Sequence, residues 1–143
     1  MIGIDIDTKI HAFARSKVEK EGLDIIFELG AATELPCLDE SLDRVVSSMV
    51  FHHLNRENKL RALKEIFRVL RPRGELHIAD FGKPHNALMY LISLFARHFE
   101  ETSDNIKGLL PEMFRKAGFA DVEETAQYMT INGTLSLYMA RKS

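Results

Sequence analysis

The chain of 143 residues is 45% hydrophobic and 28% charged, an ordinary globular composition that argues against long-range disorder. A domain usually has roughly 100–200 residues, so we expect residues 1–143 to form a single domain. The 19 basic and 21 acidic side chains give a net charge of −2, and this near balance disfavours nucleic acid as a partner.

The predicted elements alternate between strands and helices from the first residues onward. β-branched residues predict a short buried strand over residues 2–6. A helix follows, capped by Thr8 or Asp7 and ended by Gly22. A second strand is predicted over residues 25–29.

The middle of the chain continues this alternation. Residues 42–50 predict a third strand. Asn55 then caps an amphipathic helix whose apolar residues recur at helical spacing as far as Leu70. The helix ends at residues 71–74, which combine base, proline and glycine, and residues 75–80 predict a fourth strand.

The last part of the chain is predicted to hold helices and a hairpin. Helical stretches are expected over residues 86–100 and 111–117, the second with proline in its first turn. Strands are expected over residues 122–129 and 134–140, joined through the dipeptide Asn132-Gly133. Because this dipeptide is a strong signal for a tight hairpin turn, the last two strands are predicted to be antiparallel.

Cysteine content and hydropathy bear on location. The single cysteine, Cys37, excludes an intrachain disulfide framework and fits a reducing compartment. The longest apolar stretch, residues 87–96, is about half of the roughly 20 residues that cross a bilayer. Core packing or contact with a second chain explains this stretch better than a cover over an apolar substrate. We predict a cytoplasmic protein without a membrane-spanning helix.

Strands separated by helices predict an α/β fold, with a mostly parallel sheet covered on both faces and right-handed crossovers. Ligands of such sheets bind beyond the carboxyl ends of the strands. Polar residues that directly follow a strand are therefore the candidates for a site. They are Asp5, Asp7, residues 30–33, His52, His53 and Asp80.

Asp5 and the histidine pair are the most informative of these. At the end of the first strand, the Asp5 carboxylate can accept hydrogen bonds from both hydroxyls of an adenosine ribose, although a strand-end aspartate equally often caps the next helix. Asp7 lies nearer the helix, which favours a cap. Adjacent side chains of an extended segment point apart, so His52 and His53 are not expected to chelate a metal, and no metal site is predicted. One of them lining a pocket, as a base or a polar wall, is the favoured interpretation.

Three common catalytic motifs are absent from the sequence. It has no phosphate loop of the Gly-x-x-x-x-Gly-Lys type, no Gly-x-Ser-x-Gly elbow and no Gly-x-Gly-x-x-Gly. These absences disfavour nucleoside triphosphate chemistry, serine hydrolysis and a nicotinamide dehydrogenase.

Taken together, the segments resemble the class I S-adenosylmethionine-dependent methyltransferases, especially the type 11 and quinone-biosynthesis group, over nearly the entire chain. Ile2-Gly3-Ile4-Asp5-Ile6 resembles the family's second strand with its ribose-binding acid. Residues 30–36 resemble the loop beside the adenine, and residues 42–54 resemble the fourth strand and its exit. Residues 70–76 resemble the turn into the fifth strand.

The sequence departs from this family in three places. Nothing here corresponds to the family's first strand and glycine-rich loop, so we expect the chain to be truncated at its N-terminus relative to the family. That strand would lie between the first and third strands of this chain, so their edges must pair with each other or across a dimer, unless the polypeptide is longer. Ala31 stands where the family usually has an aspartate that contacts the adenine, and the alanine side chain offers no hydrogen-bond acceptor. Arg73 stands where the family has the first glycine of the turn.

The resemblance implies methyl transfer from S-adenosylmethionine to a small-molecule acceptor. It implies cofactor contacts for Asp5 at the ribose, for Ile6, Ala31, Ala32 and Leu35 around the adenine, and for Ser48. His53, and after it His52, are the candidate bases on the acceptor side.

Two other interpretations stay open. The absent glycine loop and Ala31 motivate a degenerate, non-catalytic relative that serves as a partner subunit or scaffold. A phosphoacceptor receiver domain is disfavoured, because its acceptor aspartate should follow the third strand, where this chain has Ser47 and Ser48.

Overall fold

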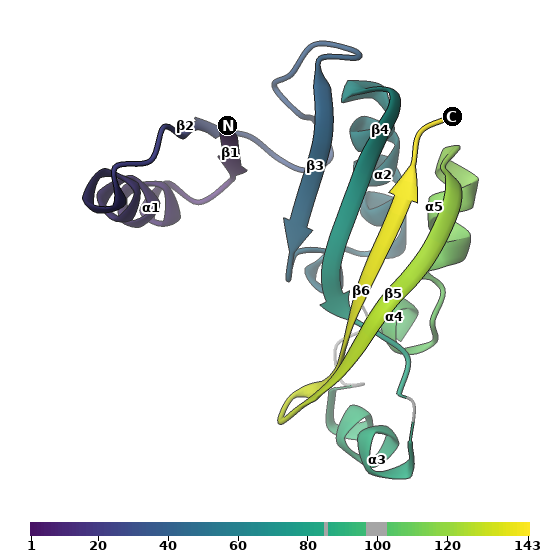
Figure 1. The fold of residues 1–143 in the computed structure, drawn as a ribbon. Helices are drawn as coiled ribbons and strands as arrows, with labels where there is room; N and C mark the ends of the chain where they lie inside the picture. The colour runs from purple at the N-terminus through teal and green to yellow at the C-terminus, as the bar shows by residue number, and fades with distance from the viewer. Residues whose placement is uncertain (85, 97–102) are drawn as a thin grey trace.

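The polypeptide forms two β-sheets that are joined by the segment following the second strand (Figure 1). The structure is a computed structural model that describes the backbone of residues 1–84, 86–96 and 103–143, and the side chains of all of these except residues 92–96. The first sheet consists of β1 (Ile2–Asp5) and β2 (Ile26–Leu29), which pair in parallel and are connected by α1 (Thr8–Glu21). The sequence predicted all three elements.

Local signals determine both ends of α1. The Asp7 carboxylate accepts a hydrogen bond from the Lys9 backbone N–H at 2.8 Å, so Asp7 is the N-cap. Gly22 has a φ of 64°, and its backbone N–H donates to the carbonyls of Glu19 and Val18. The predicted cap and the predicted end of the helix are therefore both confirmed.

The second sheet has four strands in the order β3-β4-β6-β5. β3 (Leu42–Ser48) and β4 (Leu70–Phe81) are parallel, whereas β6 (Gly133–Arg141) runs antiparallel to β4 and to β5 (Ala120–Thr130). Thr130 pairs with Gly133, which confirms the predicted antiparallel hairpin, although its two turn residues are Ile131 and Asn132 and not Asn132 and Gly133. The fold is α/β and Rossmann-like with an antiparallel C-terminal hairpin, as predicted.

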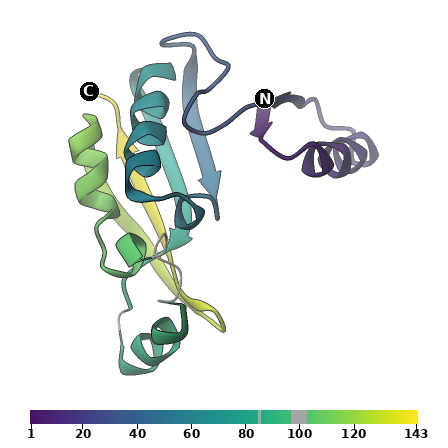
Figure 2. The same cartoon turned by 180° about the vertical axis from the view of Figure 1, so that it is seen from behind.

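Helices cover one face of this second sheet. Figure 2 shows α2 (Arg56–Val69) and α5 (Leu110–Ala117) side by side over that face. The core lies between them and the sheet, and it includes Leu63, Ile66, Leu76, Phe114 and Tyr138, each 5% exposed or less. Burial of one such side chain contributes roughly 1.5–3 kcal/mol, so this layer holds the helices on the sheet.

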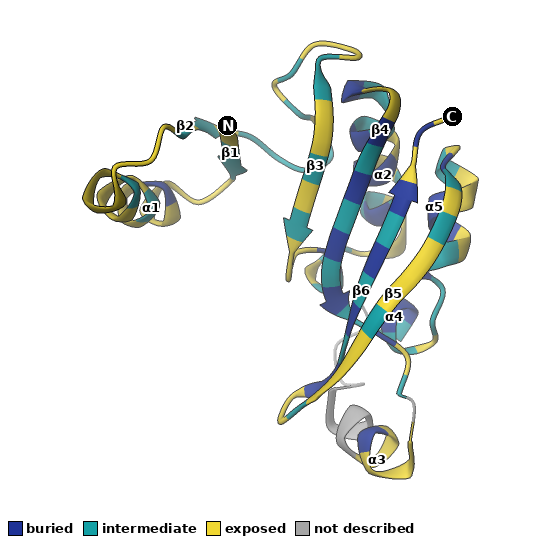
Figure 3. Ribbon diagram, viewed as in Figure 1, coloured by how far each residue is buried: buried dark blue, intermediate teal, exposed yellow. Residues whose placement is uncertain are grey.

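The opposite face of the sheet is more open than predicted. Along β4, Leu76, Ile78 and Asp80 are buried beneath the helices, whereas the alternating residues His77 and Ala79 are only half-buried (Figure 3). Because successive side chains of a strand point to opposite faces, the half-buried set marks the face away from α2 and α5. Both faces of the sheet were predicted to be covered, but only the face beneath α2 and α5 is fully covered.

Three further helices lie among the described residues. They are the 3-10 helix η1 (Phe51–His53), α3 (Ala87–Ala96) and the single-turn α4 (Ser103–Ile106). The helix predicted over residues 86–100 corresponds to α3, and its last four residues lie outside the described part. α4 was not predicted, because one turn is too short to show a helical period.

The turn between α2 and the body of β4 differs from its prediction. β4 begins at Leu70, directly after α2, and its register with β3 shifts after the pair Leu42–Leu70. The irregular stretch contains Arg73, which has a φ of 67° and donates its backbone N–H to the carbonyl of Lys142 at 2.9 Å. A left-handed conformation is unfavourable for arginine, whereas the glycine expected here from the family resemblance would adopt it without strain.

The facing edges of the two sheets are unpaired within the described residues. β1 pairs only with β2, and β3 pairs only with β4. Direct pairing of β1 with β3, one of the arrangements that the sequence left open, does not occur. Val46 on β3 is 72% exposed and Ile6 after β1 is 75% exposed, so apolar side chains border both edges.

Candidate functional site

Three of the predicted site residues lie where parallel strands end. Asp5 ends β1, Ser48 ends β3, and Asp80 lies one residue before the end of β4. In open parallel sheets this edge is where ligands bind. The structure therefore puts these side chains at the expected ends of their strands.

The Asp5 carboxylate is half-buried and partly engaged. Its Oδ1 accepts a hydrogen bond from the Asp7 backbone N–H at 2.9 Å, and its backbone carbonyl lies 3.0 Å from the His11 Nε2. Among the described residues, no hydrogen bond to Oδ2 is present. The second carboxylate oxygen of Asp5 is thus available to a hydroxyl donor.

The loop after β2 forms a compact turn. The Glu34 backbone N–H donates to the Ala31 carbonyl at 3.0 Å, and the side chains of Ala32 and Leu35 pack against the core. Ile6, which was expected in the same pocket, is exposed beyond the end of β1. Ala31 is half-buried and carries no side-chain acceptor, so only its backbone can bind a polar ligand group.

His52 is held by a buried carboxylate. Its Nδ1 lies 2.9 Å from Asp80 Oδ1, and the side chain of Asp80 is completely buried. Because an ionised carboxylate only accepts hydrogen bonds, Nδ1 is the donor in this pair. The rings of His52 and Phe81 pack in a T-shaped arrangement, with their centroids 4.9 Å apart.

Asp80 accepts three further hydrogen bonds that stabilise it in this buried position. Oδ2 accepts the Phe51 backbone N–H at 2.7 Å, and Oδ1 accepts the Phe81 backbone N–H at 2.8 Å. The Asn105 side-chain amide donates to Oδ1 at 3.1 Å. The network thus links the exits of β3 and β4 to α4.

The two histidines do not diverge as predicted. Residues 51–53 form η1 and not an extended segment, and the His52 and His53 rings lie 3.9 Å apart between centroids. The predicted divergence of the two side chains is therefore wrong, since a tight helical turn places neighbouring side chains differently from an extended segment. Among the described residues, no group of three potential metal-binding side chains occurs.

The described part of the structure does not join the predicted residues into one pocket. A surface hollow lies between α1 and β2, with His11, Arg15 and Phe27 in its wall, and it contains none of the predicted site residues. The histidine network and the Asp5 end of β1 belong to different sheets. Sequence reasoning identified Asp80 as a strand-end acid but not its partners, and Asn105 carries no local signal at all.

Comparison with known proteins identifies the class. Residues 1–78, just over half of the chain, match the family model of the methyltransferase domain. An uncharacterized protein of Haemophilus influenzae is 31% identical over 136 residues, which cover 90% of this chain and 53% of that protein. A demethylmenaquinone methyltransferase of Deinococcus radiodurans is 30% identical over 150 residues, which cover 98% of this chain and 60% of that protein. The chain therefore spans between half and two thirds of the length of these relatives.

Solved structures share the fold. A SAM-dependent methyltransferase of Methanosarcina mazei matches 99% of this chain and 81% of its own, with a TM-score of 0.77 and 22% identity. An N-methyltransferase of Haemonchus contortus, in complex with phosphomonomethylethanolamine and S-adenosylhomocysteine, matches 99% of this chain and 43% of its own, with a TM-score of 0.76 and 18% identity. The fold is that of the class I S-adenosylmethionine-dependent methyltransferases. The chain belongs to the methyltransferase domain family.

The length and the hydropathy of the helices bear on whether the chain could cross a membrane. Across the described residues, no helix combines the length and the apolar character that crossing a membrane requires.

Proposed function

We propose that this chain, as a single methyltransferase domain over residues 1–143, transfers a methyl group from S-adenosylmethionine to a small-molecule acceptor. The observation that carries the proposal is the His52–Asp80 pair at the carboxyl end of a parallel strand pair in a methyltransferase fold. The names of the relatives support a demethylated quinone, such as demethylmenaquinone, as the first acceptor to test.

The residues proposed to hold the adenosine half of the cofactor come from the end of β1 and from the loop after β2. The Asp5 Oδ2 is available to the ribose hydroxyls, while Ile6, Ala32 and Leu35 offer apolar contacts and Ala31 a backbone contact for the adenine. Ser48, exposed at the end of β3, is the residue that would lie beside the rest of the cofactor. When bound, S-adenosylmethionine supplies an electrophilic methyl group on its sulfonium.

On the acceptor side, geometry favours His52 over His53 as the base. Asp80 fixes the tautomer of His52 and stabilises the imidazolium that forms when Nε2 takes a proton from the acceptor. His53 is exposed and has no corresponding carboxylate among the described residues. The rest of the protein's task is alignment, because the methyl group and the acceptor must be held about 3–3.5 Å apart in line.

We further propose that a strand parallel to β1 and β3 pairs with both edges, supplied by a second copy or by a partner subunit. The two unpaired edges and the exposed apolar residues beside them support this arrangement. Light scattering coupled to size exclusion measures the native mass. A protein that is monomeric at all concentrations and still binds S-adenosylmethionine contradicts this proposal.

Equilibrium dialysis with labelled S-adenosylmethionine tests the function. Because a hydrogen bond to a charged group contributes about 1.5–3 kcal/mol, D5A should weaken binding at least about tenfold. D24A, which removes an exposed carboxylate from the loop before β2, should bind as the wild type does. In the transfer assay, H52Q should lower kcat by about 10²–10⁴ and H53Q much less.

The alternative is a non-catalytic methyltransferase-fold subunit. The missing acceptor at Ala31 and the unpaired edges of β1 and β3 favour it. No detectable binding at about 1 mM cofactor, a free energy weaker than about −4 kcal/mol, would reject the active enzyme. Restored activity of a full-length relative on addition of the non-binding chain would then support the alternative.

A further inference from the structure

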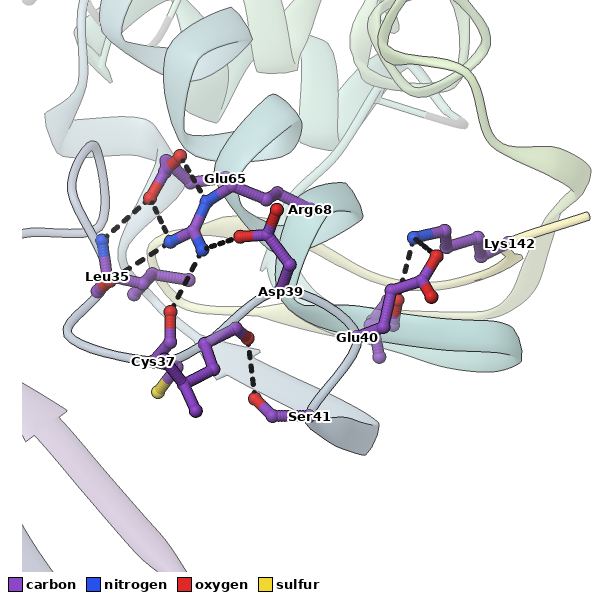
Figure 4. A network of polar contacts seen from close by, with 10 residues as sticks. Leu35, Cys37, Asp39, Glu40, Ser41, Glu65, Arg68 and Lys142 are labelled. Carbon is purple, nitrogen blue, oxygen red and sulfur yellow. Dashed lines mark hydrogen bonds and ion pairs between the residues drawn. The ribbon is translucent and has the colours of Figure 1, made fainter.

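One ion pair on α2 binds the backbone of the loop that joins the two sheets (Figure 4). The Leu35 backbone N–H donates to Glu65 Oε2 at 3.0 Å. The Arg68 guanidinium donates to the Leu35 carbonyl at 3.1 Å and to the Cys37 carbonyl at 2.9 Å. The two peptide groups that flank Leu35 are thus held by one acidic and one basic side chain of the same helix.

The ion pair is built as a fork. Arg68 Nε and Nη2 donate to the two carboxylate oxygens of Glu65 at 2.9 and 2.8 Å, while Nη1 donates to Asp39 Oδ1 at 2.6 Å. The hydrogen bond from Arg68 holds the pKa of Glu65 below its ordinary value, and Glu65 in turn raises the pKa of Arg68. Both side chains therefore stay charged at neutral pH, and their alignment is fixed by two parallel bonds.

An ordinary ion pair between residues three apart on a helix makes no contact with a distant segment of the chain. Such a pair contributes about 0.3–0.5 kcal/mol and leaves the rest of the chain unaffected. Here the same two side chains also satisfy three backbone groups of a segment some thirty residues away. The Leu35 side chain adds a third attachment, because it packs against the core beneath α2.

The loop has a special position in this fold. Residues 30–41 are the chain segment that connects the β1–α1–β2 unit to β3, and no described strand pairing joins the two sheets. The same loop carries Ala31, Ala32 and Leu35, the candidate adenine contacts. Its attachment to α2 therefore fixes the adenine end of the proposed cofactor site relative to the second sheet and to η1, which carries His52.

We infer that Arg68 and Glu65 are positioning residues, which hold residues 31–37 against α2 and thereby determine the affinity for the cofactor. This inference rests on the proposed function. Neither side chain is expected to touch the cofactor, and both act through the loop backbone. Arginine is required because lysine keeps the charge but lacks the planar fork that reaches two carbonyls and a carboxylate together.

The experiment compares R68K, R68Q and E65Q with the wild type and with R44Q. Arg44 is the matched control, since it also forms an arginine–glutamate pair, with Glu75, but on β3 and away from the loop. Hydrogen exchange followed by mass spectrometry reports the amide of Leu35, and equilibrium dialysis reports the dissociation constant for labelled S-adenosylmethionine. Thermal unfolding identifies any variant that fails to fold.

We expect faster exchange at the Leu35 amide in all three α2 variants, and cofactor binding about tenfold weaker in R68Q and R68K alike. R44Q should change neither readout. If R68K and R68Q both bind S-adenosylmethionine as tightly as the wild type although the Leu35 amide exchanges faster, the positioning role is overturned. If exchange at the Leu35 amide is unchanged, the attachment of the loop to α2 is itself overturned. If the wild type binds no cofactor, the proposed function fails, and the exchange measurement still decides whether the loop is held. E65Q keeps the arginine, so it tests the attachment if the Arg68 variants fold poorly.

Discussion

Replacing Asp80 with asparagine should destabilise the protein strongly although the two side chains have the same shape. Asp80 is fully buried and accepts one hydrogen bond at Oδ2 and three at Oδ1. The amide oxygen of asparagine will take the Oδ1 position, because three donors converge there. Its NH₂ group then faces the Phe51 backbone N–H, which lies 2.7 Å from Oδ2 in the wild type.

The magnitude follows from this donor–donor contact. One hydrogen bond is lost and two donors, the asparagine NH₂ and the Phe51 N–H, remain buried without an acceptor. Since an unsatisfied buried group costs about 1–3 kcal/mol, we expect D80N to lose about 2–4 kcal/mol of unfolding free energy. That is a large part of the roughly 5–15 kcal/mol of a typical domain.

The assay is urea unfolding followed by far-ultraviolet circular dichroism, because the chain has no tryptophan to report by fluorescence. D43N is the matched control: its carboxylate is 81% exposed and pairs with Arg71 at the surface, so the change should stay within about 0.5 kcal/mol. An unfolding free energy of D80N equal to that of D43N would refute the buried network as described.

Three further predictions concern stability. R73G should raise the unfolding free energy by about 0.5–1 kcal/mol in urea, because glycine adopts the φ of 67° without strain. N55A should lower the unfolding free energy by about 1 kcal/mol, because the Asn55 side chain accepts the Asn58 backbone N–H at the start of α2. Glu75 has a pKa of about 2, lowered mainly by its hydrogen bond with His77, so it should add stability above pH 4.5 that is lost as the pH falls from 4.5 towards 2. E75Q should therefore show a shallower loss of unfolding free energy over that acid range.

Each of these predictions has a result that contradicts it. R71G changes the arginine two residues earlier, which is not in the left-handed region, so R71G should not stabilise the protein. Equal effects of R71G and R73G would remove the conformational explanation. An N55A variant as stable as the wild type would mean that the cap is replaced by water. Parallel acid profiles for E75Q and the wild type would show that Glu75 gains nothing from its partners in the folded state.

Local sequence signals predicted most of the secondary structure correctly. Asp7 and Gly22 bound α1, Asn55 caps α2, and the Asn132-Gly133 signal lies within one residue of the turn between the antiparallel strands β5 and β6. In each case the side chain or the special φ acts on backbone groups within a few residues. Such interactions are present whatever the rest of the chain does, and they can be predicted without knowing the fold.

Only the tertiary structure decided which distant groups meet. His52 lies 28 residues from Asp80 in the chain, and Arg68 lies 33 residues from the carbonyl of Leu35 that it binds. Whether such groups come within 3 Å depends on how helices pack on a sheet, and no local pattern encodes that distance. The same holds for the edges of β1 and β3: the sequence makes each a good strand, but pairing depends on whether another strand reaches them, and within the described chain none does.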